Sequence, residues 1–88
     1  MHKNIFTIDG FNYSYNDIES IAREIEDFIW EYDTYEYRDQ YNSREELVDL
    51  IIAQLKEFKT LKQAIKILYN DDLTEELKFN KLGGILRV

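Results

Sequence analysis

The sequence predicts an α+β fold that is predominantly helical, with three to four helices and a small sheet formed by the N- and C-terminal strands. Three observations support this prediction. Apolar residues recur at helical spacing without a break over residues 15–32, capping-box patterns mark further helix starts, and short β-rich runs stand near both ends. The 88 residues hold no repeat and no Pro/Gly/Ser-rich linker, so we expect a single compact domain over residues 1–88.

Two short strand candidates precede the first helix. Residues 5–8 are rich in β-formers and end at the turn dipeptide Asp9-Gly10, and residues 11–13 continue as a second candidate. Ser14 is a suitable helix N-cap because Asp17 follows three residues later. The first helix is therefore predicted over about residues 15–32.

The first helix has one apolar stripe and two charged flanks. The stripe is about 120° wide and consists of Ile18, Ile21, Ala22, Ile25, Phe28, Ile29 and Tyr32. One flank carries Asp17, Glu24, Asp27 and Glu31, and the other carries Glu19 and Glu26. Trp30 is placed about 150° from the centre of the stripe, close to Glu19, Arg23 and Glu26.

The next elements are predicted from helix-capping residues and from the places where helical periodicity stops. Residues 33–42 lack helical periodicity, and the alternation of Tyr35 and Tyr37 predicts a loop or a short edge strand. A second helix is predicted from the capping box at residues 43–46 to about Phe58, and a third over about residues 61–69.

The C-terminal segment is predicted to return to the N-terminal strand. A short fourth helix is capped by residues 72–75 and ends at about Phe79. Gly83-Gly84 is expected to break the chain, and residues 85–88 are expected to form a strand that pairs with residues 4–8.

Composition excludes several function classes. Eleven basic and 18 acidic side chains give a net charge of −7, which disfavours direct binding to nucleic acid or to an anionic membrane. The absence of Cys excludes disulfides, Cys-ligated zinc and thiol catalysis, and it fits a cytoplasmic protein. With His2 as the single His and no glycine-rich phosphate loop, we expect no enzymatic activity, no cofactor and no metal.

The negative charge is concentrated in the first half of the chain. Residues 1–45 contain 11 acids and 4 bases, whereas residues 46–88 contain 7 of each. Trp and Tyr, which are enriched at interface hot spots, cluster in the same acidic region. We therefore predict a partner-binding surface whose residues are Asp17, Glu24, Asp27, Trp30, Glu31, Tyr35, Glu36, Tyr37 and Asp39.

This surface suggests an inhibitor that mimics a nucleic-acid backbone. Carboxylates three or four residues apart on a helix are about 5–6 Å from one another, which is near the phosphate repeat of a strand. Such a protein binds the basic, nucleic-acid-binding surface of a larger enzyme and occludes it. Scarce Pro, Gly and Ala with abundant Ile, Asn, Lys, Glu and Tyr are typical of a low-GC bacterium, phage or plasmid. Phage and mobile-element anti-defence proteins, anti-CRISPR and anti-restriction inhibitors among them, fit this description.

Length, acidity and the opening strand-turn-helix order resemble small acidic inhibitors such as barstar. The resemblance covers the N-terminal part of the chain and shares no motif. The alternatives are an immunity or antitoxin protein that neutralises a basic toxin nuclease, and a homodimeric structural module joined through Trp30 and the Tyr cluster. An ordinary solvated helix face explains the same carboxylates without a partner.

Overall fold

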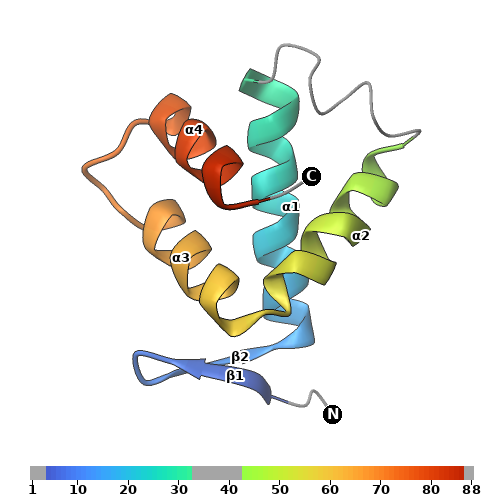
Figure 1. The fold of residues 1–88 in the computed structure, drawn as a ribbon, viewed down its shortest axis with the longest axis vertical. Helices are drawn as coiled ribbons and strands as arrows, with labels where there is room; N and C mark the ends of the chain where they lie inside the picture. The colour runs from blue at the N-terminus through green and yellow to red at the C-terminus, as the bar shows by residue number, and fades with distance from the viewer. Residues whose placement is uncertain (1–3, 33–42, 87–88) are drawn as a thin grey trace.

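The computed structural model describes residues 4–32 and 43–86, in which a β-hairpin precedes four helices. The elements are β1 (Asn4–Ile8), β2 (Phe11–Ser14), α1 (Tyr15–Tyr32), α2 (Arg44–Leu55), α3 (Phe58–Leu68) and α4 (Glu75–Ile85). Helix α1 forms the spine of the molecule, with α2 on one side of it and α3 and α4 on the other (Figure 1). The hairpin lies at the end of the molecule where α1 begins.

The two strands form an antiparallel hairpin with a two-residue turn. Ile8 pairs with Phe11 across the turn. Asp9 and Gly10 both have positive φ, 51° and 84°, as a type I′ turn requires. The predicted pairing of N- and C-terminal strands is wrong, because β1 takes its neighbour β2 as partner. A two-residue loop closes at a far smaller entropic cost than a loop spanning the whole domain.

The predicted chain break at Gly83-Gly84 is wrong, and Ile85, which was expected to begin a strand, is the last residue of a helix. Helix α4 continues beyond Phe79, through Gly83 and Gly84, to Ile85. Leu82 and Leu86 are buried in the core, and the backbone N–H of Leu86 donates to the carbonyl of Leu82 at 2.9 Å. Burial of these two side chains outweighs the cost of about 1 kcal/mol that each glycine imposes on a helix interior.

The junction between α2 and α3 comes earlier than predicted. Helix α2 ends at Leu55 rather than Phe58, and α3 begins at Phe58 rather than at about residue 61, with Glu57 in the N-cap position. The Phe58 ring packs edge-on against Phe6 of the hairpin, with ring centroids 5.5 Å apart. This contact joins the start of α3 to β1. The apolar periodicity of a single helix does not predict a contact with a distant strand.

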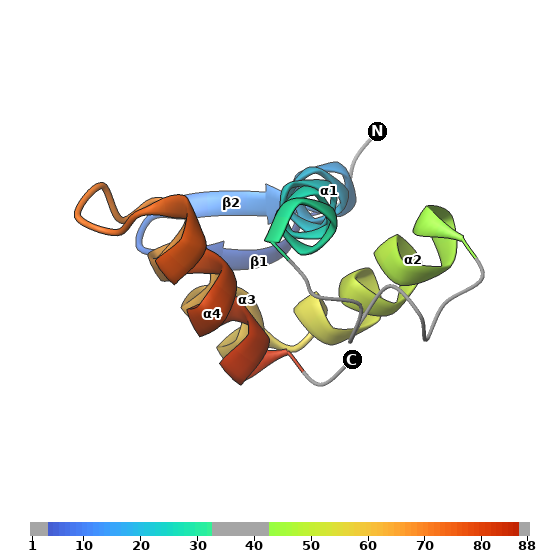
Figure 2. The same ribbon diagram turned by 90° about the horizontal axis from the view of Figure 1, so that it is seen from above.

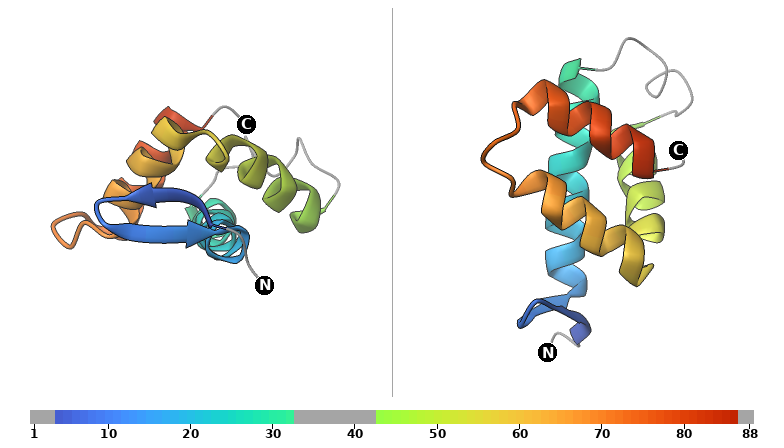
Figure 3. Two further views of the ribbon diagram at one scale, coloured as in Figure 1. Left: turned by 90° about the horizontal axis from the view of Figure 1, so that it is seen from below. Right: turned by 60° about the vertical axis from the view of Figure 1, so that its left-hand side comes forward.

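Helix α1 has the predicted bounds and supplies the centre of the core. The Ser14 backbone N–H donates to the Asp17 carboxylate at 2.8 Å, and the Asp17 N–H donates to the Ser14 hydroxyl at 3.4 Å. This is the expected capping box. Helix α1 packs against α2, α4 and β2, while α3 packs against α2 and α4. Viewed along the spine, α3 and α4 lie together on one side of α1 (Figure 2), and both cross it at an angle (Figure 3).

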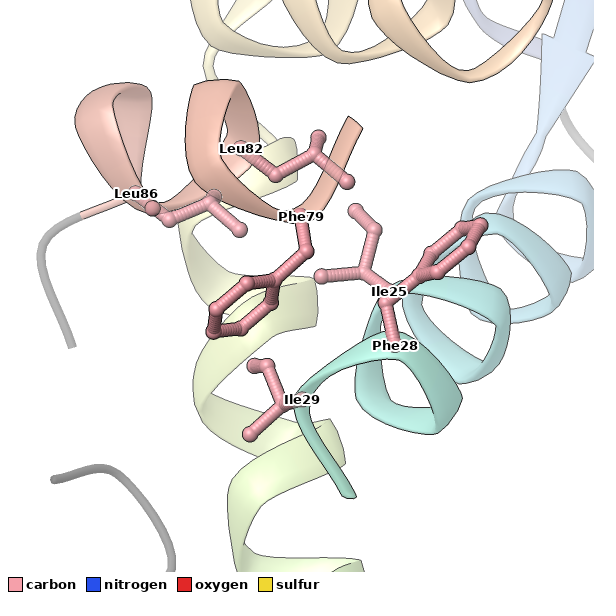
Figure 4. A pocket seen from close by; sticks show the side chains of 7 residues that line it. Ile25, Phe28, Ile29, Phe79, Leu82 and Leu86 are labelled. Atoms are coloured by element: carbon pink, nitrogen blue, oxygen red, sulfur yellow. The ribbon is translucent and has the colours of Figure 1, made fainter. Parts of the chain in front are cut away.

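The contact between α1 and α4 is apolar and nearly filled. Phe79, Leu82 and Leu86 face Ile25 and Ile29 of α1 (Figure 4). The gap between them measures about 10 Å³, which is roughly the room one water needs. It is a packing gap rather than a ligand site. No helix within residues 4–32 and 43–86 is long and apolar enough to cross a membrane.

The two glycines Gly84 and Gly10 should respond oppositely to alanine. A Cβ at Gly84 meets no atom within 4 Å. Gly84→Ala should therefore raise the free energy of unfolding by about 0.5–1 kcal/mol, because alanine lowers the conformational entropy of the unfolded chain. Gly10→Ala has equal space but requires positive φ, so it should cost about 1–2 kcal/mol. Urea unfolding followed by circular dichroism measures both. A loss of stability in Gly84→Ala would contradict a helical C-terminal segment.

Candidate functional site

The charged side chains of α1 divide into two flanks on either side of the buried stripe, as predicted. We call one flank the acidic stripe; it consists of Asp17, Glu24, Asp27 and Glu31, all of them exposed. We call the other the arginine flank; it consists of Glu19, Arg23, Glu26 and Trp30 with Arg44 and Glu45 of α2. The flanks differ because α2 packs against only one side of α1, and it contributes arginine there.

The arginine flank is built around a buried carboxylate. Glu26 is only 4% exposed, whereas the sequence placed it on a surface flank. Arg44 donates from Nε to Glu26 Oε2 at 2.5 Å and from Nη2 to Asp27 Oδ1 at 2.9 Å. The hydrogen bond to Glu26, with the charges of both acids, raises the pKa of Arg44. A buried carboxylate needs such a partner because an unpaired charge is expensive to remove from water.

Arg23 makes a second link between α1 and α2. Its guanidinium donates to Glu45 through two pairs of atoms, Nη1 to Oε1 at 3.1 Å and Nη2 to Oε2 at 3.4 Å. Glu19 lies 3.9 Å away on the other side. The hydrogen bond from Arg23 and its positive charge lower the pKa of Glu45. Arg23 therefore neutralises acids of the arginine flank, whereas Arg44 neutralises Glu26 of that flank and Asp27 of the acidic stripe.

Trp30 lies on the arginine flank rather than among the acids of the stripe. The side chain is 37% exposed, and the Arg44 guanidinium carbon lies 5.1 Å from its ring centroid. This distance is within the range of a cation–π contact. One face of the indole is therefore already covered by Arg44, which also pairs with Asp27 of the acidic stripe.

The members of the acidic stripe differ in how far the fold already uses them. Asp17 caps α1 through Ser14, and Asp27 pairs with Arg44. Glu24 and Glu31 are exposed, and seven residues separate them. Seven residues are nearly two helical turns, so these two carboxylates lie on one line about 10 Å apart along the helix.

Helix α4 extends the acidic surface at the C-terminal end of α1. The Tyr32 hydroxyl donates to Glu75 Oε2 at 2.8 Å. This hydrogen bond, partial burial and the charge of Glu31 raise the pKa of Tyr32 to about 12. Glu75 and Glu76 occupy the first turn of α4, where the helix dipole favours acids. These two acids were not among the predicted site residues, because the position of Glu75 beside Tyr32 depends on how α4 packs against α1.

The remaining predicted site residues, Tyr35, Glu36, Tyr37 and Asp39, lie outside the described residues. Their assignment stays a prediction.

Comparison with protein-family models, curated proteins and solved structures found no match to this chain. Function is therefore argued from the chemistry of the surface. Among the residues that the structure describes, no group of three or more His, Cys, Asp or Glu is placed to hold a metal ion.

A groove that the sequence analysis missed opens between the hairpin and α3. We call it the aromatic groove; it measures about 330 Å³ and is lined by Ile8, Asp9, Phe11, Tyr13, Ile65 and Tyr69. Phe11 and Tyr69 are 69% and 60% exposed, the two most exposed large apolar side chains described. The alternation of Phe11 and Tyr13 after a turn could have indicated the wall that the hairpin contributes. No pattern in the sequence around Tyr69 indicated that this side chain lies opposite the hairpin.

The Glu26–Arg44 pair should behave as a coupled unit. Arg44→Met leaves the Glu26 carboxylate buried without its guanidinium, so it should lower the free energy of unfolding by about 2–3 kcal/mol. Adding Glu26→Leu removes the unpaired charge, and the double variant should return to within about 1 kcal/mol of the parent. Urea unfolding of the parent, both single variants and the double variant measures the coupling. Additive losses would show that the pair is not coupled.

Proposed function

We propose that the chain is a non-enzymatic acidic protein-binding module that acts in the cytoplasm as an inhibitor. Its acidic stripe occupies a basic, nucleic-acid-binding surface of a larger enzyme and occludes it. One observation carries the proposal: the charges of α1 are segregated. Arg23 pairs with Glu45 of the arginine flank, and Arg44 pairs with Glu26 there and with Asp27 of the acidic stripe. Among the described residues, Glu24 and Glu31 form no ion pair with an arginine, so the outward-facing negative charge of the stripe rests on these two exposed acids.

The spacing within the acidic stripe supports mimicry of a polyanion. Glu24 and Asp27 are three residues apart, and Asp27 and Glu31 are four apart, so neighbouring carboxylates lie about 5–6 Å from one another. A Lys/Arg groove that follows a phosphate backbone meets a similar series of negative charges. The excess negative charge also steers a basic partner toward this face, which makes association fast and sensitive to salt.

Anti-defence inhibition is the biological setting that we propose for this chemistry, with an anti-CRISPR or anti-restriction target. The acidic stripe suits an immunity or antitoxin protein equally, because a basic toxin nuclease presents the same kind of surface. The two settings differ in the identity of the enzyme and not in the face that binds it.

Charge reversal within the acidic stripe tests the proposal. The double variant Glu24→Lys/Glu31→Lys changes two exposed acids that neither cap α1 nor pair with Arg44. Affinity capture from the native host identifies the partner, and calorimetry then compares the parent and the variant. At about tenfold for each lost charge pair, affinity should fall by about 100-fold.

A matched control separates the position of the charge from its amount. Asp49→Lys/Glu57→Lys makes the same change in net charge at exposed positions on α2 and just before α3. It should bind within a few-fold of the parent. Retained binding by Glu24→Lys/Glu31→Lys, or equal losses in both double variants, would rule out the acidic stripe as the binding face.

A further inference from the structure

The aromatic groove lies beside the acidic stripe. Partial burial raises the pKa of Tyr69, and the charges of Glu24, Tyr13 and Asp17 raise it further. Ser14 follows Tyr13 of the groove and donates its backbone N–H to the Asp17 carboxylate at 2.8 Å, so the N-terminal end of the acidic stripe borders the groove. Asp9 adds a further carboxylate at the turn of the hairpin.

Two lysines lie on the helix that forms one wall of the groove. Lys62 and Lys66 precede Ile65 and Tyr69 by three residues each, so they are their neighbours on the surface of α3. The groove therefore has a carboxylate at the hairpin turn and another at the start of α1, with lysines on the helix of its other wall. This polarity defines how a charged ligand must be oriented.

We infer that the aromatic groove is the apolar subsite of the proposed binding face, and that it takes an amphipathic basic segment of the partner protein. An apolar side chain of the segment packs between Phe11 and Tyr69, and its Lys or Arg residues point toward Asp9, Asp17 and Glu24. The inference rests on the proposed function and names the feature of the partner that is bound beside the acidic stripe.

Size, exposure and charge favour this occupant. A groove of 330 Å³ lies near the lower end of the roughly 300–1,000 Å³ typical of ligand pockets, which suits a segment rather than a domain surface. Burial of exposed aromatic surface is the kind of contact that forms interface hot spots. An acidic segment would bring its charge next to Asp9 and Asp17 and would approach a chain whose own net charge is −7. A second copy of this chain carries a net charge of −7 itself, so long-range repulsion opposes it.

Three synthetic peptides of equal length test the inference on the full chain. The first has Leu at positions i, i+3, i+4 and i+7 with Lys elsewhere; the second replaces Lys with Glu, and the third replaces Leu with Ser. Two-dimensional NMR of the isotope-labelled chain should show shifts at Phe11, Tyr13 and Tyr69 with the Lys/Leu peptide. The Glu/Leu and Lys/Ser peptides should bind at least about tenfold more weakly. Equal binding of either control peptide, or shifts confined to the arginine flank, would overturn the inference.

Variants of the groove provide the second measurement. Phe11→Ser and Tyr69→Ala each remove one exposed wall, and each should weaken the Lys/Leu peptide by about tenfold or more. Leu77→Ser removes a comparable exposed apolar side chain from α4 and should leave binding unchanged. Circular dichroism checks that each variant is folded. Full binding by both groove variants, or a mass in light scattering twice that of the chain which Tyr69→Ala abolishes, would overturn the inference.

The outcomes separate this inference from the proposed function. If Glu24→Lys/Glu31→Lys loses the captured enzyme while Phe11→Ser and Tyr69→Ala retain it, the groove is not part of the face and the proposed function stands. If the stripe variant retains the captured enzyme, the proposed function fails, whatever the peptides show.

Discussion

Burial of the apolar stripe of α1 is the constraint on which the rest of the structure depends. Ile18, Ile25 and Ile29 are almost completely buried, and α2, α4 and the hairpin all pack against the same helix. Because 18 residues of helix present only one apolar stripe, every charged side chain of α1 is forced onto a flank or the outer face. The position of the acidic stripe is thus a consequence of the core.

The two flanks have different roles because α2 lies along only one of them. On that side Arg44 and Arg23 pair with Glu26 and Glu45, and the positive charge of both helices is used within the fold. Glu24 and Glu31 are on the side without arginine. Asp27 joins the two sides through its ion pair with Arg44, so the exposed acids that pair with no arginine in the described part of the chain, Glu24 and Glu31, lie on either side of Asp27 along the acidic stripe. On an ordinary solvated helix, by comparison, both signs are mixed along the surface.

Sequence patterns predicted the elements that depend on local rules. The capping box at Ser14, the length of α1, its two flanks and the cap at Ser43 all follow from spacing within one helix. The predictions were wrong where contacts between different elements determine helix bounds and burial. Leu82 and Leu86 hold two glycines in a helix, Phe58 extends α3 toward Phe6, and the burial of Glu26 depends on Arg44 of another helix. The aromatic groove was missed for the same reason, since its walls come from β2 and α3.

We propose that the acidic stripe and a nucleic acid compete for one surface of the partner enzyme. The most direct measurement titrates this chain into a complex of the captured enzyme with its fluorescently labelled nucleic acid and follows the release of the label. Competition predicts complete release at one chain per binding site, a midpoint that rises with the concentration of nucleic acid, and loss of the effect in Glu24→Lys/Glu31→Lys. A ternary complex that retains the labelled nucleic acid at unchanged affinity would contradict the claim.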